Sequence, residues 1–159
     1  MTQNSNLSGN QIRKMKSASR LYAVQALFQM EHSGQTTDVI IREFLDFRFG
    51  ETYEEGSMLD GDLDHFRKTV EDAVNHQAAI DQLTDRALVV KWPLGRIDPT
   101  LRGLFRAAGA EMMEGDAPAK VVISEYVTVA AAFFPEGKES KFVNAVLDHM
   151  AREVKPQDF

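Results

Sequence analysis

The stretch WPLGRIDPTLRGLFRAAGAEMM, residues 92–113, decides how the chain is divided and which class of fold it adopts. Trp92 and Pro93 form a strong helix stop, because proline lacks a backbone donor and clashes with the preceding turn. Asp98 and Pro99 form a helix start, with an aspartate to cap the first turn and a proline at the first helical position. The stretch therefore predicts two helical halves, one on each side of it.

Apolar residues recur at helical spacing on both sides of this division. The helix that follows it is expected to bury Leu101, Leu104, Phe105, Ala108 and Met112. Further helices are predicted at about 16–33, 39–50, 62–90 (with a bend near His76), 118–133 and 138–154. With six or seven helices and no convincing strand, the prediction is an all-α fold. It comprises a disordered lead-in at 1–12 and one domain at 13–159, with subdomains at about 13–91 and 94–154.

The composition is that of an ordinary globular protein. Of 159 residues, 43% are hydrophobic and 26% are charged, and none is cysteine. Disulfides, thiolate metal sites and cysteine nucleophiles are therefore excluded. The longest apolar stretch, Val127 to Phe134, is too short to span a bilayer, and the polar N-terminus carries no secretory signal. We expect a cytoplasmic protein that does not enter a membrane.

The net charge of -6 conceals an asymmetry between the two ends of the chain. Residues 1–30 contain Arg13, Lys14, Lys16 and Arg20 and no acid, so this segment carries +4 and the other 129 residues carry -10. A basic arm (residues 13–20) on an acidic body can bind a polyanion. The alternative is a solvated tail that keeps the domain in solution.

No constellation of residues indicates catalysis. His65 and His76 lie three helical turns apart, roughly 16 Å, which is too far to share a metal ion. Asp60, Asp62 and Asp64 imitate the start of a calcium loop, but the position that requires glycine holds His65, and the acids fit a helix start better. No nucleotide-binding or nucleophile motif is present. We predict neither an enzyme nor a cofactor.

Two basic patches suggest RNA as the polyanion. Arg13, Lys16 and Arg20 are spaced by three and four residues, so they share one face of a helix. The last helix begins with Lys138 and Lys141 beside Phe142, with Asn144 close by. Cations beside an aromatic ring can hold phosphates and stack a base. The alternative interpretation of Phe142 is simple packing in the core.

Several stretches, in the right order, resemble the NusB family of transcription antitermination factors. KFVNAVLD at 141–148 resembles the family's KFVNGVLD, and VISEYV at 122–127, after Pro118, resembles VAINEAV. WPL at 92–94 and the following RI, LR and LFR resemble the region WPLERL…DRAILRLA, and AVQALFQ at 23–29 resembles AVQALYQ. The resemblance covers about residues 16–32 and 80–152. It implies two small helical bundles packed across each other.

The resemblance also implies partners. These are boxA RNA of ribosomal RNA transcripts, the small-subunit ribosomal protein NusE, and the RNA polymerase elongation complex, in which premature termination is opposed. It implies that RNA is contacted by Arg13, Lys14, Lys16, Arg20, Lys141 and Phe142. It implies that NusE is contacted by Phe28, Arg96, Leu101 and Arg102. The wide apolar face of the first helix would also permit a homodimer that hides the RNA patch.

Some residues depart from the family's pattern. Ser17, Ala18 and Ser19 dilute a run that is often rich in arginine, Ser124 replaces an asparagine, and Ala131 and Ala132 lie where a lysine is common. Each change removes a candidate RNA or capping contact. The alternative function is therefore a helical protein-interaction module with weak or no RNA binding. A NusB-like domain attached to a ribosomal RNA methyltransferase is a third reading, but this chain has no room for the catalytic domain.

Overall fold

The structure, a computed structural model, describes residues 8–47, 52–53, 56–57, 62–88 and 97–159. These residues form seven α-helices, one pair of short strands and a final 3-10 turn. In chain order they are α1 (Gly9–Ser33), α2 (Thr37–Phe47), β1 (Thr52–Tyr53), β2 (Gly56–Ser57), α3 (Leu63–Asn75), α4 (Gln77–Ala87), α5 (Pro99–Glu114), α6 (Ala119–Phe133), α7 (Lys138–Val154) and η3 (Pro156–Asp158). The predicted all-α class is confirmed.

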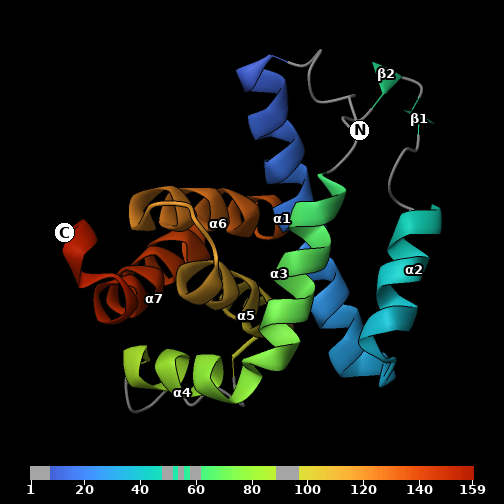
Figure 1. The fold of residues 1–159 in the computed structure, drawn as a ribbon. Coiled ribbons are helices and arrows are strands. Elements are labelled where there is room, and N and C mark those ends of the chain that lie inside the picture. The colour runs from blue at the N-terminus through green and yellow to red at the C-terminus, as the bar shows by residue number, and fades with distance from the viewer. Residues whose placement is uncertain (1–7, 48–51, 54–55, 58–61, 89–96) are drawn as a thin grey trace.

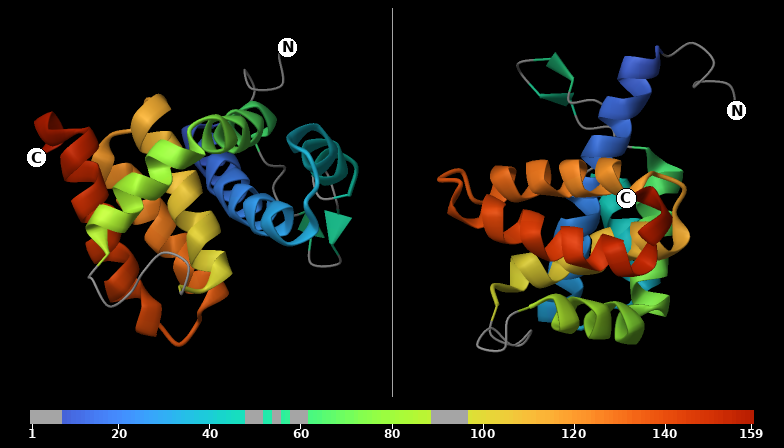
Figure 2. Two further views of the ribbon diagram at one scale, coloured as in Figure 1. Left: turned by 90° about the horizontal axis from the view of Figure 1, so that it is seen from below. Right: turned by 90° about the vertical axis from the view of Figure 1, so that its left-hand side faces the viewer.

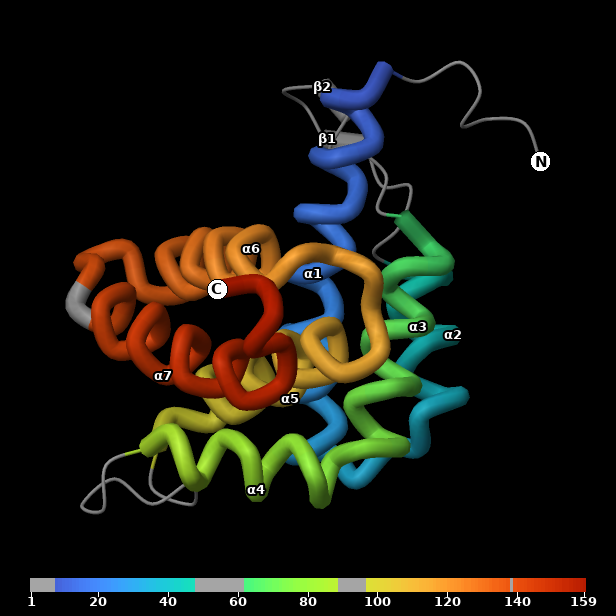
Figure 3. The backbone as a smooth tube through the Cα atoms, turned by 60° about the vertical axis from the view of Figure 1, so that its left-hand side comes forward, coloured from blue at the N-terminus to red at the C-terminus, as the bar shows by residue number. Residues whose placement is uncertain are grey.

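Two groups of helices cross at α1 and α5 (Figure 1). Helices α1, α2 and α3 pack together, while α4, α6 and α7 pack around α5. Helix α5 also contacts α1 and α3, so it lies at the centre of the molecule. The tube view in Figure 3 shows the second group beside α1 and α3.

The central position of α5 follows from its sequence. It buries all five residues of its predicted inner face, and also glycine and alanine residues on its other sides. A helix that is apolar almost all round is expected to be covered on every side. At Gly103 the backbones come close, because a Cβ there would lie 3.1 Å from the Val24 carbonyl oxygen of α1. The predicted start of α5 is confirmed by the side chain of Asp98, which accepts a hydrogen bond of 2.8 Å from the Thr100 N–H.

Helix α1 begins earlier than its apolar spacing indicates. The sequence predicts helix from about Lys16 and a disordered lead-in through residue 12, whereas residues 9–12 are already helical. The reason is a capping box, in which Ser8 and Gln11 each bond the other's backbone N–H. Residues 1–7 lie outside the described part of the chain. The predicted end is confirmed, because Gly34 adopts the left-handed conformation that closes a helix.

The boundary between the two groups lies at His76, whereas the sequence predicts it at Trp92. The predicted bend at His76 is present, and beyond it α4 packs against α5 and α7. The apolar stripe of residues 62–90 is continuous, so it does not reveal that its two halves bury themselves against different neighbours. Trp92 and Pro93 lie outside the described residues.

The structure also differs from two smaller expectations, one about a loop and one about the exposed face of α1. The segment expected to be a loop contains a minimal antiparallel pair, with Thr52 opposite Ser57 and Tyr53 opposite Gly56. Most of the wide apolar face of α1 is covered within the chain, since Tyr22, Val24 and Leu27 are buried against the core and Phe28 remains exposed. That face therefore gives no support to a homodimer.

Candidate nucleic-acid interface

The N-terminal turns of α1 stand clear of α3 and α6, as Figures 1 and 2 show. We call residues 9–16 the projecting turns. Arg13, Lys14 and Lys16 are exposed there, and the guanidinium of Arg13 bonds only weakly to Asn10 Oδ1, at 3.3 Å. Three predicted RNA-binding cations are therefore presented to solvent from an ordered helix. They remain close to one another because the capping box fixes the helix upstream of them.

Arg20, the fourth cation of the basic arm, is buried, with 5% of its surface exposed. Its Nε and one terminal nitrogen donate to Glu111 of α5 at 2.8 and 3.0 Å. Its other terminal nitrogen donates to Glu125 of α6 at 3.1 Å. The prediction that Arg20 contacts RNA is therefore wrong, because both carboxylates already occupy its donors inside the protein.

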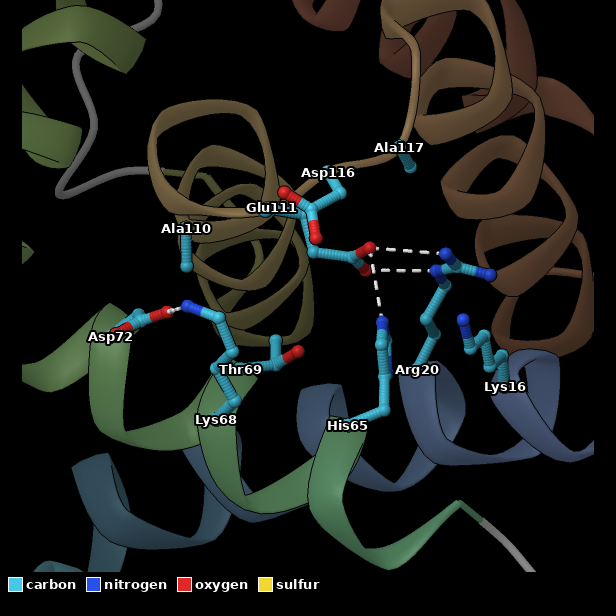
Figure 4. Close-up of a pocket in the computed structure, with 11 residues that line it drawn as sticks. Lys16, Arg20, His65, Lys68, Thr69, Asp72, Ala110, Glu111, Asp116 and Ala117 are labelled. Atoms are coloured by element: carbon cyan, nitrogen blue, oxygen red, sulfur yellow. Dashed lines mark hydrogen bonds and ion pairs between the residues drawn. The ribbon is translucent and has the colours of Figure 1, made fainter. Parts of the chain in front are cut away.

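Glu111 is the centre of this buried network, and Figure 4 shows its bonds to Arg20 and His65. Besides Arg20, its carboxylate accepts hydrogen bonds from Tyr126 Oη at 2.5 Å and from His65 Nε2 at 3.1 Å. Burial alone would raise the pKa of Glu111, but the hydrogen bonds and charges of His65 and Arg20 outweigh it and lower the pKa to about 2. Burial and the neighbouring Glu111 raise the pKa of Tyr126 well above its ordinary value. The network thus joins α1, α3, α5 and α6 through one ionised carboxylate.

Helical spacing did not lead to the prediction of an ion pair between Glu111 and Arg20, although a signal for it is present in the sequence. Glu111 follows Leu104 and Ala108 by seven and three residues, so it falls on the buried stripe of α5. Arg20 likewise precedes Val24 by four residues on the stripe of α1. Opposite charges on two apolar stripes indicate a buried ion pair, since an unpaired charge there would be very costly. His65 gives no such signal.

A small cleft of about 130 Å³ adjoins the network. Lys16 and Lys68 line it, but so do Asp72 and Asp116. Lys68 is held by Asp72 at 2.6 Å. The mixed charges give the cleft no clear preference for an anion.

The predicted patch on α7 is only partly exposed. Lys141 and Asn144 are exposed. Phe142 is half-buried and packs edge-on against Phe105, with ring centroids 6.2 Å apart, so it serves the core as well as the surface. Lys138 begins the helix, and its side chain lies outside the described part of the chain.

This patch is not adjacent to the projecting turns. In the right-hand view of Figure 2, α6 lies between them and α7, and α6 contacts both α1 and α7. An open groove of about 640 Å³ runs between α6 and α7. It is lined by Lys120 and Ser124 on one side and by Asn144 and Arg152 on the other. A strand of RNA following the surface from the projecting turns to α7 would therefore cross α6.

The residues predicted to contact a protein partner have different environments. Phe28 is 36% exposed on α1, and the centroids of its ring and of the His32 ring lie 4.3 Å apart. Arg102 is partly exposed nearby, where its Nε donates to Glu31 at 2.9 Å and a terminal nitrogen to the Ile97 carbonyl at 2.9 Å. Leu101 is a core residue, so its predicted role as a contact is wrong. Arg96 lies outside the described residues.

Arg102 belongs to a chain of ion pairs along the edge of α5. Glu31 also accepts from Arg106 at 2.9 Å, and Arg106 reaches Asp81 of α4 at 2.9 Å. Hydrogen bonds from Arg102, and the charges of both arginines, lower the pKa of Glu31. Phe28 is therefore an exposed ring near Arg102 and Arg106. The charges of these two arginines are balanced by Glu31 and Asp81.

No group of three or more His, Cys, Asp or Glu side chains among the described residues is arranged to hold a metal ion. No described helix is both long enough and apolar enough to cross a membrane.

Comparison with known proteins gives a consistent result. The sequence model of the NusB family matches residues 17–152. The transcription antitermination protein NusB of Maricaulis maris (strain MCS10) is 44% identical over 147 residues, covering 92% of this chain and 91% of the relative. The protein of the same name from Caulobacter vibrioides (strain ATCC 19089 / CIP 103742 / CB 15) is 43% identical over 150 residues, covering 94% of this chain and 99% of the relative.

Solved structures agree. A structure of T. maritima NusB has a TM-score of 0.71 and 29% identity, covering 91% of this chain and 96% of that chain. A structure of the antitermination factors NusB and NusE in complex with double-stranded RNA has a TM-score of 0.72, covering 87% and 97%. At 20% identity, this second likeness shows the fold alone.

Proposed function

The chain belongs to the NusB family, and on this premise we propose that it is an antitermination factor that binds boxA RNA together with NusE. Its curated relatives carry the name transcription antitermination protein. The chain acts by binding, and catalysis is not part of the proposal. A factor that acts on nascent transcripts works in the cytoplasm beside the RNA polymerase elongation complex.

One observation carries the RNA proposal. Arg13, Lys14 and Lys16 are exposed on one ordered helix end, on a chain whose residues beyond 30 carry -10. Local positive charge on an acidic protein favours binding of a polyanion at that place and disfavours it elsewhere. Lys141 and Asn144 on α7 supply a second contact, reached across α6. This path places a base against the partly exposed ring of Phe142 and leaves Arg20 out.

The proposal is tested by titrating a labelled boxA oligonucleotide with the protein, with and without NusE. A scrambled RNA of equal length is the control. We expect tighter binding to boxA, and affinity that falls steeply with salt because each neutralised phosphate releases counterions. Equal binding to both RNAs, in both conditions, would instead favour the protein-interaction module.

The NusE surface is proposed to centre on Phe28. An exposed aromatic ring beside arginine is typical of interface hot spots. Replacing Phe28 with alanine is expected to weaken NusE binding about tenfold or more. Binding of boxA RNA by the protein alone should not change. Calorimetry measures the first quantity and the oligonucleotide titration the second.

Val39→Ala is the matched control for this substitution. Val39 is 50% exposed and lies on α2, a different helix from that of Phe28, so its loss should leave NusE binding intact. Unchanged NusE affinity in the Phe28 variant would remove this surface from the proposal without affecting the RNA site.

A further inference from the structure

Two serines lie where the projecting turns of α1 join the body of the protein. In the sequence, Ser17 and Ser19 look like places where the basic arm has lost arginines. Two helical positions separated by two residues point roughly 200° apart around the axis. Each serine therefore faces a different neighbour, Ser17 toward α6 and Ser19 toward α3.

Ser19 joins α1 to the start of α3. Its side chain is fully buried, and Oγ donates a hydrogen bond of 2.7 Å to the carbonyl of Asp62. The N–H of Asp62 in turn donates to the carbonyl of Met15 at 3.1 Å. Asp62 is itself fixed, because its side chain caps α3 by accepting from the His65 N–H at 3.0 Å. The two bonds between α1 and Asp62 hold one side of the helix at the base of the projecting turns.

Ser17 joins α1 to α6 on the other side. Its Oγ lies 2.6 Å from Glu125 Oε1, a charge-assisted hydrogen bond. The same carboxylate oxygen accepts from Arg20 at 3.1 Å, which ties Ser17 to the buried network. Glu125 is only partly exposed, so this bond is sheltered from water.

We propose that Ser17 and Ser19 are positioning residues for RNA binding, which hold the projecting turns helical and in one direction. This inference rests on the proposed function. A cation fixed in its bound position loses less conformational freedom on binding than one on a mobile tail. By holding the cations of the arm in fixed positions, the serines thus compensate for its low number of positive charges. Neither position can present an arginine to RNA without losing its contact with α3 or α6.

The anchoring is tested first without RNA, by amide hydrogen exchange on the double variant Ser17→Ala, Ser19→Ala. We expect exchange at residues 9–16 to become about tenfold faster, because removing the anchors favours local opening. The variant should fold, since the Asp62 carbonyl still accepts from the Phe66 N–H at 2.9 Å and Glu125 keeps Arg20. Ser33→Ala, at the far end of α1, is the matched control and should leave residues 9–16 unchanged. Unaltered exchange at residues 9–16 in the double variant would overturn the anchoring.

The consequence for RNA is tested by titrating a boxA oligonucleotide at several salt concentrations. The double variant should bind about fivefold to tenfold more weakly, the effect of losing a few hydrogen bonds. The dependence of affinity on salt should not change, because no phosphate contact is lost. Ser17→Thr, which keeps the hydroxyl, should bind like the wild type.

Failure of the positioning role of the serines can be distinguished from failure of the proposed function. A salt slope lowered by about 0.7 or more would mean that the double variant has lost a cation contact to phosphate, and it would overturn the claim that the serines only position cations that keep their contacts. Unchanged affinity in the double variant would overturn it as well. Absence of boxA binding by the wild type would overturn both the proposed function and the RNA role of the serines, while the exchange experiment would still decide whether they anchor α1.

Discussion

Replacing Glu111 with alanine is expected to lower the free energy of unfolding by about 3–5 kcal/mol, because it leaves the buried Arg20 without its main partner. Tyr126 and His65 lose their acceptor at the same time. Urea unfolding followed by circular dichroism measures the change. Glu153→Ala is the control, since Glu153 pairs with Arg86 on the surface and such pairs contribute about 0–1 kcal/mol. Equal, small effects of both substitutions would contradict the account of the network.

The same carboxylate makes stability depend on pH. The pKa of Glu111 is lowered from 4.5 to about 2 in the folded protein. Its stabilisation is therefore complete above the unfolded value and is lost as pH falls from about 4.5 toward 2. This lowering of the Glu111 pKa corresponds to about 3 kcal/mol of stabilisation of the folded protein. The variant Glu111→Gln should lack this part of the acid sensitivity, which unfolding measured at several pH values would show.

Replacing Arg13, Lys14 and Lys16 together with alanine is expected to weaken boxA binding about a hundredfold at about 0.1 M salt. Each phosphate contact to a single strand contributes about 0.7 to the salt slope, so three contacts contribute about 2. The slope of log affinity against log salt should fall by the same amount. Fluorescence anisotropy at four or five salt concentrations measures both quantities.

The control for this variant is the replacement of Arg42, Arg67 and Arg86 with alanine. These residues are exposed on α2, α3 and α4, and their loss changes the net charge by the same amount. We expect little change in slope. If both triple variants lost affinity equally, overall charge would govern binding and the projecting turns would have no special role.

Local signals in the sequence predicted most of the fold. The Asp98 cap, the Gly34 end, the bend at His76 and the buried stripe of α5 are all confirmed, because caps and periodicity act within a few residues. The boundary between the helix groups was not predictable in this way. Residues 77–87 have the same apolar pattern whether they pack on α3 or on α5, and only the three-dimensional arrangement decides.

The candidate site was predicted less completely for a related reason. Helical spacing placed Arg13, Lys16 and Arg20 on one face of a helix. It could not show that this face becomes buried between Lys16, which is exposed, and Arg20, which is not. Leu101 was misassigned for another reason: its helical spacing predicts burial, which is confirmed, and only the family resemblance gave it a partner contact. Ser17 and Ser19 looked like lost charges because their partners, Glu125 and Asp62, are distant in sequence.

The central claim is that RNA binds along the projecting turns of α1 and the start of α7. Hydrogen exchange of the whole chain, with and without a boxA oligonucleotide, measures this directly. The account predicts slower exchange at residues 9–17 and 138–145 when RNA is bound, with α2 (Thr37–Phe47) unchanged. Slower exchange confined to α2, with residues 9–17 unaffected, would contradict it.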